Sequence, residues 1–184
     1  MDWYVASFFF LIFTYRLSQF YAIIKAKNLY KPNHQGDYGI ALVWGPLTLA
    51  VILAPYDYLL RQESAGVGWI VLGSSFFIIA TVIRGKSLAD ISKEFFFFHD
   101  KGAIIQIHTN GIYHHIRHPL YLSNIIFMLA CATYFKSMLA FLAFLLGIAG
   151  VIVKTNLEEK ALSSIYEDFN DYKLKTAKLL PRIY

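Results

Sequence analysis

The chain has 184 residues, of which 57% are hydrophobic, 17% are aromatic and only 16% are charged. A soluble domain carries about 25% charged residues, and disordered segments and nucleic-acid-binding modules do not have this much apolar surface to hide. With a mean hydropathy of +0.48, the composition favours an integral membrane protein with no nucleic-acid partner. The net charge of +5 therefore needs another explanation.

Five apolar runs follow one another along the chain, each bounded by charged or turn residues, at 5–24, 40–60, 67–83, 120–135 and 138–153. A helix needs roughly 20 such residues to cross a hydrocarbon core of about 30 Å. The sequence thus predicts an all-α, polytopic membrane protein with about five transmembrane helices. Only Lys136 and Ser137 separate the last two runs, which indicates an antiparallel helical hairpin.

The basic residues are unevenly divided between the two sides that this topology defines. With the N-terminus outside, 14 of the 17 Lys and Arg residues fall on the other side. Short cytoplasmic loops hold such an excess of basic residues, and the lipid bilayer attracts them through its anionic headgroups. We therefore expect the N-terminus to lie outside and the C-terminal tail to be cytoplasmic.

Two stretches lack the pattern of membrane helices. The stretch 87–117 mixes aromatic and charged residues, and we interpret it as an amphipathic connector at the headgroup level that ends in a turn at Asn110-Gly111. After the fifth run the sequence becomes polar. Glu158 and Glu159 are interpreted there as the start of a separate helical segment in the tail.

The densest polar cluster in the chain is the block 111–121. Pro119 suits the first turn of a helix, where its missing N–H is not needed, so it predicts the start of the fourth span. Arg117 and His118 then stand at a helix N-terminus, where backbone N–H groups and a guanidinium can bind a carboxylate or a phosphate. The alternative is that Arg117 only reaches lipid phosphate and that His118 caps the helix.

A second polar cluster, formed by Lys154, Glu158 and Glu159, follows the fifth run. Because the fourth and fifth spans form a hairpin, this cluster returns to the level of Arg117, and the topology brings acid and base together. The alternative is that Lys154 and Glu158, four residues apart, only pair along their own helix.

Two further polar features are less informative. His114 and His118 have the spacing of two metal ligands on a helix, but Pro119 disfavours a helix before it and no third ligand is near, so no metal site is expected. Arg16 lies at mid-depth in the first run, where a charge is costly unless it faces protein, water or a partner. The sequence does not separate such a role from a side chain that reaches the headgroups.

The two clusters resemble those of the isoprenylcysteine carboxyl methyltransferase family of integral membrane enzymes. That family has a G-x-Y-x-x-x-R-H-P-x-Y block, as at 111–121 here, and a later E-E-x-x-L block, as at 158–162. The resemblance covers residues 107–181. It implies transfer of a methyl group from S-adenosylmethionine to the carboxylate of a lipid-like, prenylcysteine-type or otherwise membrane-dissolved substrate.

The same resemblance implies roles for individual residues. Arg117, Glu158 and Glu159 would be catalytic, and the residues along the donor site would be Tyr113, Arg117, His118, Pro119, Tyr121, Lys154 and Glu159. The family usually has an arginine where this chain has Lys154, and lysine keeps the charge but loses the bidentate fork. We accordingly divide the chain into N-terminal transmembrane helices, 1–86, and a catalytic region, 87–184.

Three alternatives remain at this point. Steroid 5-alpha reductases have a similar R-H-P-x-Y block and would imply NADPH as the cofactor. A phospholipid or small-amine methyltransferase of related design would need a general base, because an amine must lose a proton. A non-enzymatic membrane subunit would use the polar block only to bind lipid headgroups or a partner.

Overall fold

The computed structural model describes residues 3–25, 39–91, 109–166 and 168–180 of the chain. These residues form α-helices and one short 3-10 helix, η1, with no strand longer than an isolated bridge among them. In chain order the elements are α1 (Trp3–Lys25), α2 (Gly39–Arg61), α3 (Val67–Ile91), η1 (Gly111–His114), α4 (Pro119–Tyr134), α5 (Met138–Ile165) and α6 (Phe169–Lys175).

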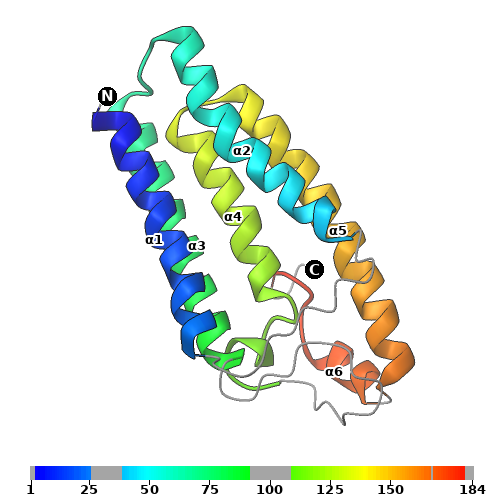
Figure 1. Cartoon of the computed structure of the whole chain (residues 1–184). Helices are drawn as coiled ribbons and strands as arrows, with labels where there is room; N and C mark the ends of the chain where they lie inside the picture. The colour runs from blue at the N-terminus through cyan, green and yellow to red at the C-terminus, as the bar shows by residue number, and fades with distance from the viewer. Residues whose placement is uncertain (1–2, 26–38, 92–108, 167, 181–184) are drawn as a thin grey trace.

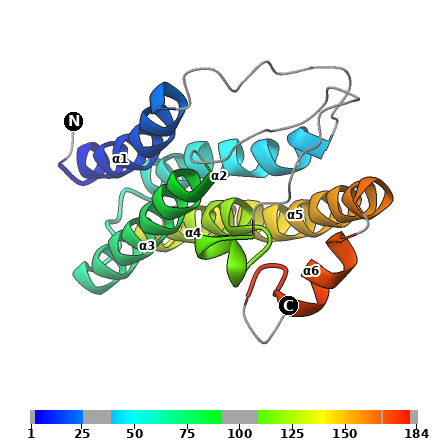
Figure 2. The same cartoon turned by 90° about the horizontal axis from the view of Figure 1, so that it is seen from below.

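The five long helices run alternately up and down one bundle (Figure 1). Helix α4 lies between the pair α1 and α3 and the pair α2 and α5, and it packs against α3, α5 and α2. The α2–α3 connection and the α4–α5 turn lie at one end, which we call the hairpin end. Helices η1 and α6 lie at the other, the α6 end (Figures 1 and 2).

The helices have the length and composition of an integral membrane protein. In the described part of the chain, three of them are long and apolar enough to cross a membrane: Ala41–Arg61, Val67–Asp90 and Met138–Ser164. Two shorter apolar stretches, Trp3–Leu17 and Pro119–Tyr134, lie in the other two helices of the bundle. Large apolar side chains are exposed along these helices, as on Phe10 and Phe13 of α1. The predicted all-α membrane fold is confirmed.

Two predicted helix ends are wrong. Helix α3 continues past residue 83 to Ile91, and α5 continues past residue 153 to Ile165. Glu158 and Glu159 therefore lie inside α5 and do not start a separate helix. The physical reason is that charged residues end an apolar run without ending a helix. No glycine or proline follows Lys154 in α5, and the pair from Lys154 to Glu158 supports the helix across this boundary.

The connector is described only in part, because residues 92–108 lie outside the described residues. The predicted turn that closes it is confirmed. Gly111 has a positive φ of 62°, which glycine adopts without strain. A Cβ atom there would collide with the carboxylate of Asp90. Asp90 also accepts a hydrogen bond of 2.8 Å from the backbone N–H of Ile112, so the turn is held against the end of α3.

The predicted antiparallel hairpin of the last two spans is also confirmed. Lys136 takes a positive φ of 51°, and the Ser137 hydroxyl caps α5 by accepting from the Ala140 N–H at 3.1 Å. Arg61 of α2 donates from Nη2 to the carbonyl of Phe135 at 3.0 Å. The tight turn returns α5 along α4, which brings the end of α5 to the beginning of α4.

Close packing of α3 on α4 fixes the centre of the bundle. At Gly73 of α3, an added Cβ atom would lie 2.6 Å from both Cα and N of Tyr134. The Tyr134 ring in turn stacks on Tyr4 of α1, with ring centroids 5.1 Å apart, and the Tyr4 hydroxyl donates to the Tyr134 carbonyl at 2.5 Å. The absence of a side chain at Gly73 therefore permits the contact on which three helices converge.

We expect Gly73→Ala to destabilise the bundle, because backbone atoms of Tyr134 cannot move aside for a methyl group. Overpacking of this kind costs about 1–3 kcal/mol, which thermal unfolding of the purified protein in detergent would detect. The control is Gly85→Ala in the interior of the same helix, where nothing lies within 4 Å of the added atom. Equal unfolding midpoints for the two variants would contradict the proposed close approach.

Candidate active site

Backbone hydrogen bonds join the segment before α4 to the segment after α6. The Arg117 N–H donates to the Ala177 carbonyl at 2.9 Å, and the Ala177 N–H donates to the His115 carbonyl at 3.1 Å. The His118 N–H donates to the Lys178 carbonyl at 3.1 Å. These bonds form a parallel bridge between Ile116 and Ala177. The bridge holds the beginning of α4 against the C-terminal segment.

Helix α6 is fastened to η1 by a buried tyrosine. The Tyr172 hydroxyl donates to the backbone carbonyl of Tyr113 at 2.6 Å. Tyr113 itself is buried at the α6 end, between α3 and α6. Burial raises the pKa of both hydroxyls, that of Tyr172 to about 12. Both tyrosines are therefore protonated at ordinary pH and act as hydrogen-bond donors or packing groups, not as bases.

Glu159 of α5 is the centre of an acid–base cluster at the α6 end. Its Oε1 accepts from Arg117 Nε at 2.8 Å and lies 3.2 Å from His118 Nε2. Its Oε2 lies 3.4 Å from Lys178 Nζ and 3.8 Å from Lys173 Nζ. The carboxylate is only 6% exposed, so four basic side chains surround a nearly buried acid.

Arg117 directs its donors into the protein. Besides Glu159, it contacts the Thr176 carbonyl, and its Nη1 lies 3.1 Å from the Lys173 carbonyl and 3.3 Å from Thr176 Oγ1. Its side chain is only 9% exposed. The alternative that Arg117 simply reaches lipid phosphate is therefore not what the structure shows. Arg117 connects α4, α5 and the segment after α6.

Glu158 belongs to the same cluster but is more accessible. Its Oε1 accepts from the Tyr121 hydroxyl at 2.6 Å and lies 3.2 Å from Lys154 Nζ, while its Oε2 lies 3.8 Å from His118 Nδ1. The Glu158 side chain is 19% exposed. The pairing of Lys154 with Glu158 along α5 is thus real, and it coexists with contacts from α5 to α4.

The structure brings together most of the residues that the sequence singled out. Arg117, His118, Tyr121, Lys154, Glu158 and Glu159 form one connected cluster. Pro119 begins α4 as predicted, and His118 occupies the N-cap position without a side-chain cap. Its imidazole points to the two glutamates instead. Tyr113 holds η1 against α6.

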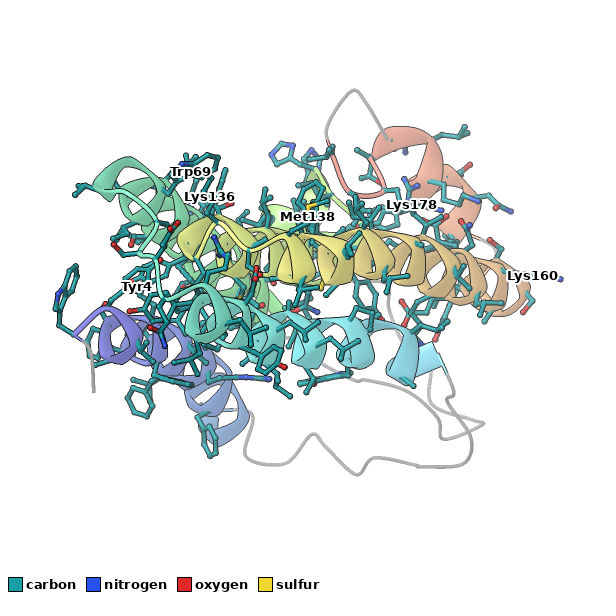
Figure 3. The ribbon with its side chains drawn as sticks, turned by 90° about the horizontal axis from the view of Figure 1, so that it is seen from above. Tyr4, Trp69, Lys136, Met138, Lys160 and Lys178 are labelled. Carbon is teal, nitrogen blue, oxygen red and sulfur yellow. The ribbon has the colours of Figure 1, made fainter. Side chains whose placement is uncertain are left out.

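Figure 3 shows Lys178 and Lys160 at this end of the bundle, away from Tyr4 and Lys136 at the hairpin end.

Sequence reasoning missed the contribution of the C-terminal segment. Lys173 and Lys178 counted only as charges that set the membrane orientation, and Thr176 carried no pattern at all. Lys178 also donates to Asn156 Oδ1 of α5 at 2.5 Å. The density of lysines after α5 was the one available indication, and it does not say which lysine turns back toward the acids.

Two remaining features are the candidate metal ligands and Arg16. In the described residues, no group of three or more His, Cys, Asp or Glu side chains is arranged to hold a metal ion. Arg16 packs its guanidinium over the ring of Trp44, 4.9 Å from the ring centroid, so it faces a neighbouring helix. This cation–π contact explains part of how a charge is accommodated in α1.

We expect Glu159→Gln to lower the free energy of unfolding by about 3 kcal/mol, because it leaves several nearly buried cations without their shared carboxylate. Glu158→Gln should cost about 1 kcal/mol or less, since water screens the more exposed pair. Thermal unfolding in detergent measures both. The control, Glu63→Gln, alters an exposed carboxylate at the hairpin end. A larger loss for Glu158→Gln than for Glu159→Gln would contradict the ranking.

Tyr172 also gives the stability a defined pH dependence. Its pKa in the folded protein, about 12, lies above the usual value of 10.0, because burial disfavours the charged form. The contribution of Tyr172 to stability is therefore complete below pH 10 and is lost as the pH rises toward 12. Tyr172→Phe should show a smaller loss of unfolding temperature across this range, whereas Tyr56→Phe, at an exposed position, should behave as the unaltered protein.

A match to a known protein family covers the two polar clusters. A family model described as phospholipid methyltransferase matches residues 69–168, which is more than half of the chain. The match includes both polar clusters but not the C-terminal segment that packs against them. No curated protein matches the chain significantly. The isoprenylcysteine carboxyl methyltransferases, which the two motifs resemble, fall within the same family. The chain therefore belongs to the phospholipid methyltransferase family and is a membrane methyltransferase.

Proposed function

We propose that the acid–base cluster at the α6 end binds S-adenosylmethionine and transfers its methyl group to an acceptor dissolved in the membrane. The observation that carries the proposal is the direct contact of Glu158 and Glu159 with the start of α4, at one end of an apolar bundle. A mixed cluster of this kind is suited to a ligand that carries both charges. Membership of a methyltransferase family favours methyl transfer over reduction by NADPH or simple lipid binding.

The chemistry of the side chains fits this donor. S-adenosylmethionine supplies a methyl group on a positively charged sulfonium, and it also carries an ammonium and a carboxylate. Glu158, the more accessible of the two acids, is suited to compensate a positive charge of the ligand. Lys154 beside it can pair with a carboxylate, as a point charge and not as a bidentate fork. Tyr121 keeps the Glu158 side chain in place through its hydroxyl.

Glu159 and Arg117 have a different role in this proposal. Both are nearly buried and bonded to each other, and Arg117 is further fixed by backbone carbonyls. The resemblance implies a catalytic role for both residues. We infer instead that they act as positioning residues, which hold α4, α5 and the C-terminal segment in the geometry of the donor site. Preorganised charges of this kind need no rearrangement when a ligand binds. The other residues proposed along the donor site are His118, Pro119 and Tyr113.

For the acceptor, we propose the carboxylate of a lipid-like or prenylcysteine-type molecule. A carboxylate attacks the methyl carbon without losing a proton, so alignment of the two reactants and exclusion of water are the main requirements. Around the two glutamates the structure has four Lys and Arg side chains: Arg117, Lys154, Lys173 and Lys178. This surplus of positive charge attracts an anionic acceptor to the α6 end.

A lipid amine is the second candidate acceptor, and the name of the matching family favours it. An amine acceptor must give up a proton. We propose that His118 takes this proton. Its Nε2 lies at hydrogen-bond distance from Glu159, while its Nδ1 is 3.8 Å from Glu158. In the tautomer that donates from Nε2, the Nδ1 atom can accept a proton.

We further propose that the α6 end faces the cytoplasm. The beginning of α1 and the segment after α6 lie at opposite ends of the bundle (Figure 1), as an odd number of crossings requires. Most of the basic residues belong to the α6 side of this topology, and excess Lys and Arg mark cytoplasmic loops. A water-soluble donor would enter from that side, and the acceptor would enter from the membrane.

Calorimetry of the purified protein against S-adenosylhomocysteine tests the donor site. We expect saturable binding that Glu158→Gln weakens by roughly tenfold, the loss of one charge-assisted contact. Glu63→Gln at the hairpin end should leave the affinity unchanged. Absence of binding by the unaltered protein would overturn the proposal. Transfer of labelled methyl groups to a prenylcysteine and to an aminophospholipid, measured in parallel, then decides between the two acceptors.

A further inference from the structure

Arg84 of α3 is a charge that the proposed active site does not use. Its side chain is buried between α1, α3 and α4, and the residue is only 6% exposed. The Arg84 Nη1 donates to Tyr15 Oη and to Asn124 Oδ1, both at 3.2 Å. The guanidinium carbon also lies 5.0 Å from the centroid of the Tyr15 ring. All of these partners are neutral.

The guanidinium of Arg84 is incompletely satisfied. Its Nε is buried and makes no hydrogen bond, and within the described residues no carboxylate lies at ion-pair distance from it. Asp90, further along α3, accepts from Ile112 instead. A buried cation without a counter-ion is costly, and a charged residue within a membrane span points to a functional site. An anion with two acceptor oxygens would supply both a counter-charge for the guanidinium and an acceptor for Nε.

An apolar hollow lies nearby between α1 and α3, and Thr81 in its wall is three residues before Arg84 in α3. It has a volume of about 130 Å³ and is lined by Leu11, Thr14, Phe77, Ile78, Thr81 and Val82. The hydroxyls of Thr14 and Thr81 bond back to carbonyls of their own helices at 2.8 Å, so the walls present apolar surface. The hollow lies between α1 and α3 at the level of the membrane span. It suits a hydrocarbon chain attached to the anion.

We propose that Arg84 binds the phosphate of an anionic membrane lipid, with the beginning of an acyl chain in the hollow between α1 and α3. A guanidinium can donate two parallel hydrogen bonds to a phosphate, and this would satisfy Nε together with an Nη. Arg16 follows Tyr15 in α1 and adds positive charge at this level of the bundle. A free phosphate ion shares the headgroup chemistry, but the apolar hollow favours a lipid.

This lipid site is distinct from the donor site, although the two are neighbours. Asn124, which contacts Arg84, lies three residues beyond Tyr121, which contacts Glu158. Three residues correspond to roughly 4.5 Å along a helix. The proposal does not depend on methyl transfer. Its ligand need not be the acceptor, and its test uses a lipid that has neither an amine nor a free carboxylate.

The test is lipid binding by the full chain in a mild detergent, followed by native mass spectrometry during titration with dioleoyl phosphatidylglycerol. The uncharged dioleoylglycerol and inorganic phosphate serve as matched ligands. We expect phosphatidylglycerol to bind roughly tenfold or more tightly than dioleoylglycerol. Arg84→Gln should lose this preference, whereas Arg84→Lys should retain part of it. Lys136→Gln, which removes one charge at the hairpin end, should bind as the unaltered protein does.

Several results would overturn the proposal. If Arg84→Gln binds phosphatidylglycerol as tightly as the unaltered protein does, Arg84 is not part of the site. If the unaltered protein binds the two lipids equally tightly, the phosphate is not recognised. If inorganic phosphate binds and the lipid does not, the ligand is a free anion and the lipid assignment is wrong. If Arg84→Gln does not fold, Arg84→Lys and the comparison of the two lipids with the unaltered protein still decide the outcome.

Discussion

The contact between Arg117 and the nearly buried carboxylate of Glu159 is the interaction on which the arrangement of the site depends. It joins the start of α4 to the later turns of α5, and Arg117 also bonds to Thr176 in the segment that follows α6. Ion pairs removed from water bring little net stability, because desolvation offsets most of the attraction. They do penalise any arrangement in which one partner is missing, and so they specify one geometry for three segments that are distant in the sequence.

The helical membrane fold could be predicted from the sequence because lipid imposes a simple rule on composition and length. The hairpin could be predicted because only two polar residues separate the last apolar runs, and Pro119 marked the start of α4. The ends of α3 and α5 could not. Hydropathy reports where a chain leaves the hydrocarbon core, whereas Lys154 and Glu158 continue the hydrogen bonds of α5 beyond that level.

In the candidate site, too, some contacts could be predicted from the sequence and others could not. The meeting of Arg117 with Glu159 followed from the hairpin, since its topology returns the end of α5 to the start of α4. The contribution of Lys178 depended on the bridge between Ile116 and Ala177, a pairing of backbones that no side-chain pattern announces. The buried position of Arg84 could not be predicted either. In the sequence, an arginine near the end of an apolar run cannot be distinguished from one that only sets the membrane orientation.

The contacts of Arg117 also restrict how the site can evolve. If the two charges were exchanged, position 117 would carry a carboxylate and position 159 would carry an arginine. Yet the carbonyls of Lys173 and Thr176 also accept from Arg117, and an acid in its place would set acceptor against acceptor. Mutations that exchange the two charges would therefore disrupt the site. The arginine has to stay at position 117 as long as the chain at the end of α6 turns these carbonyls toward it.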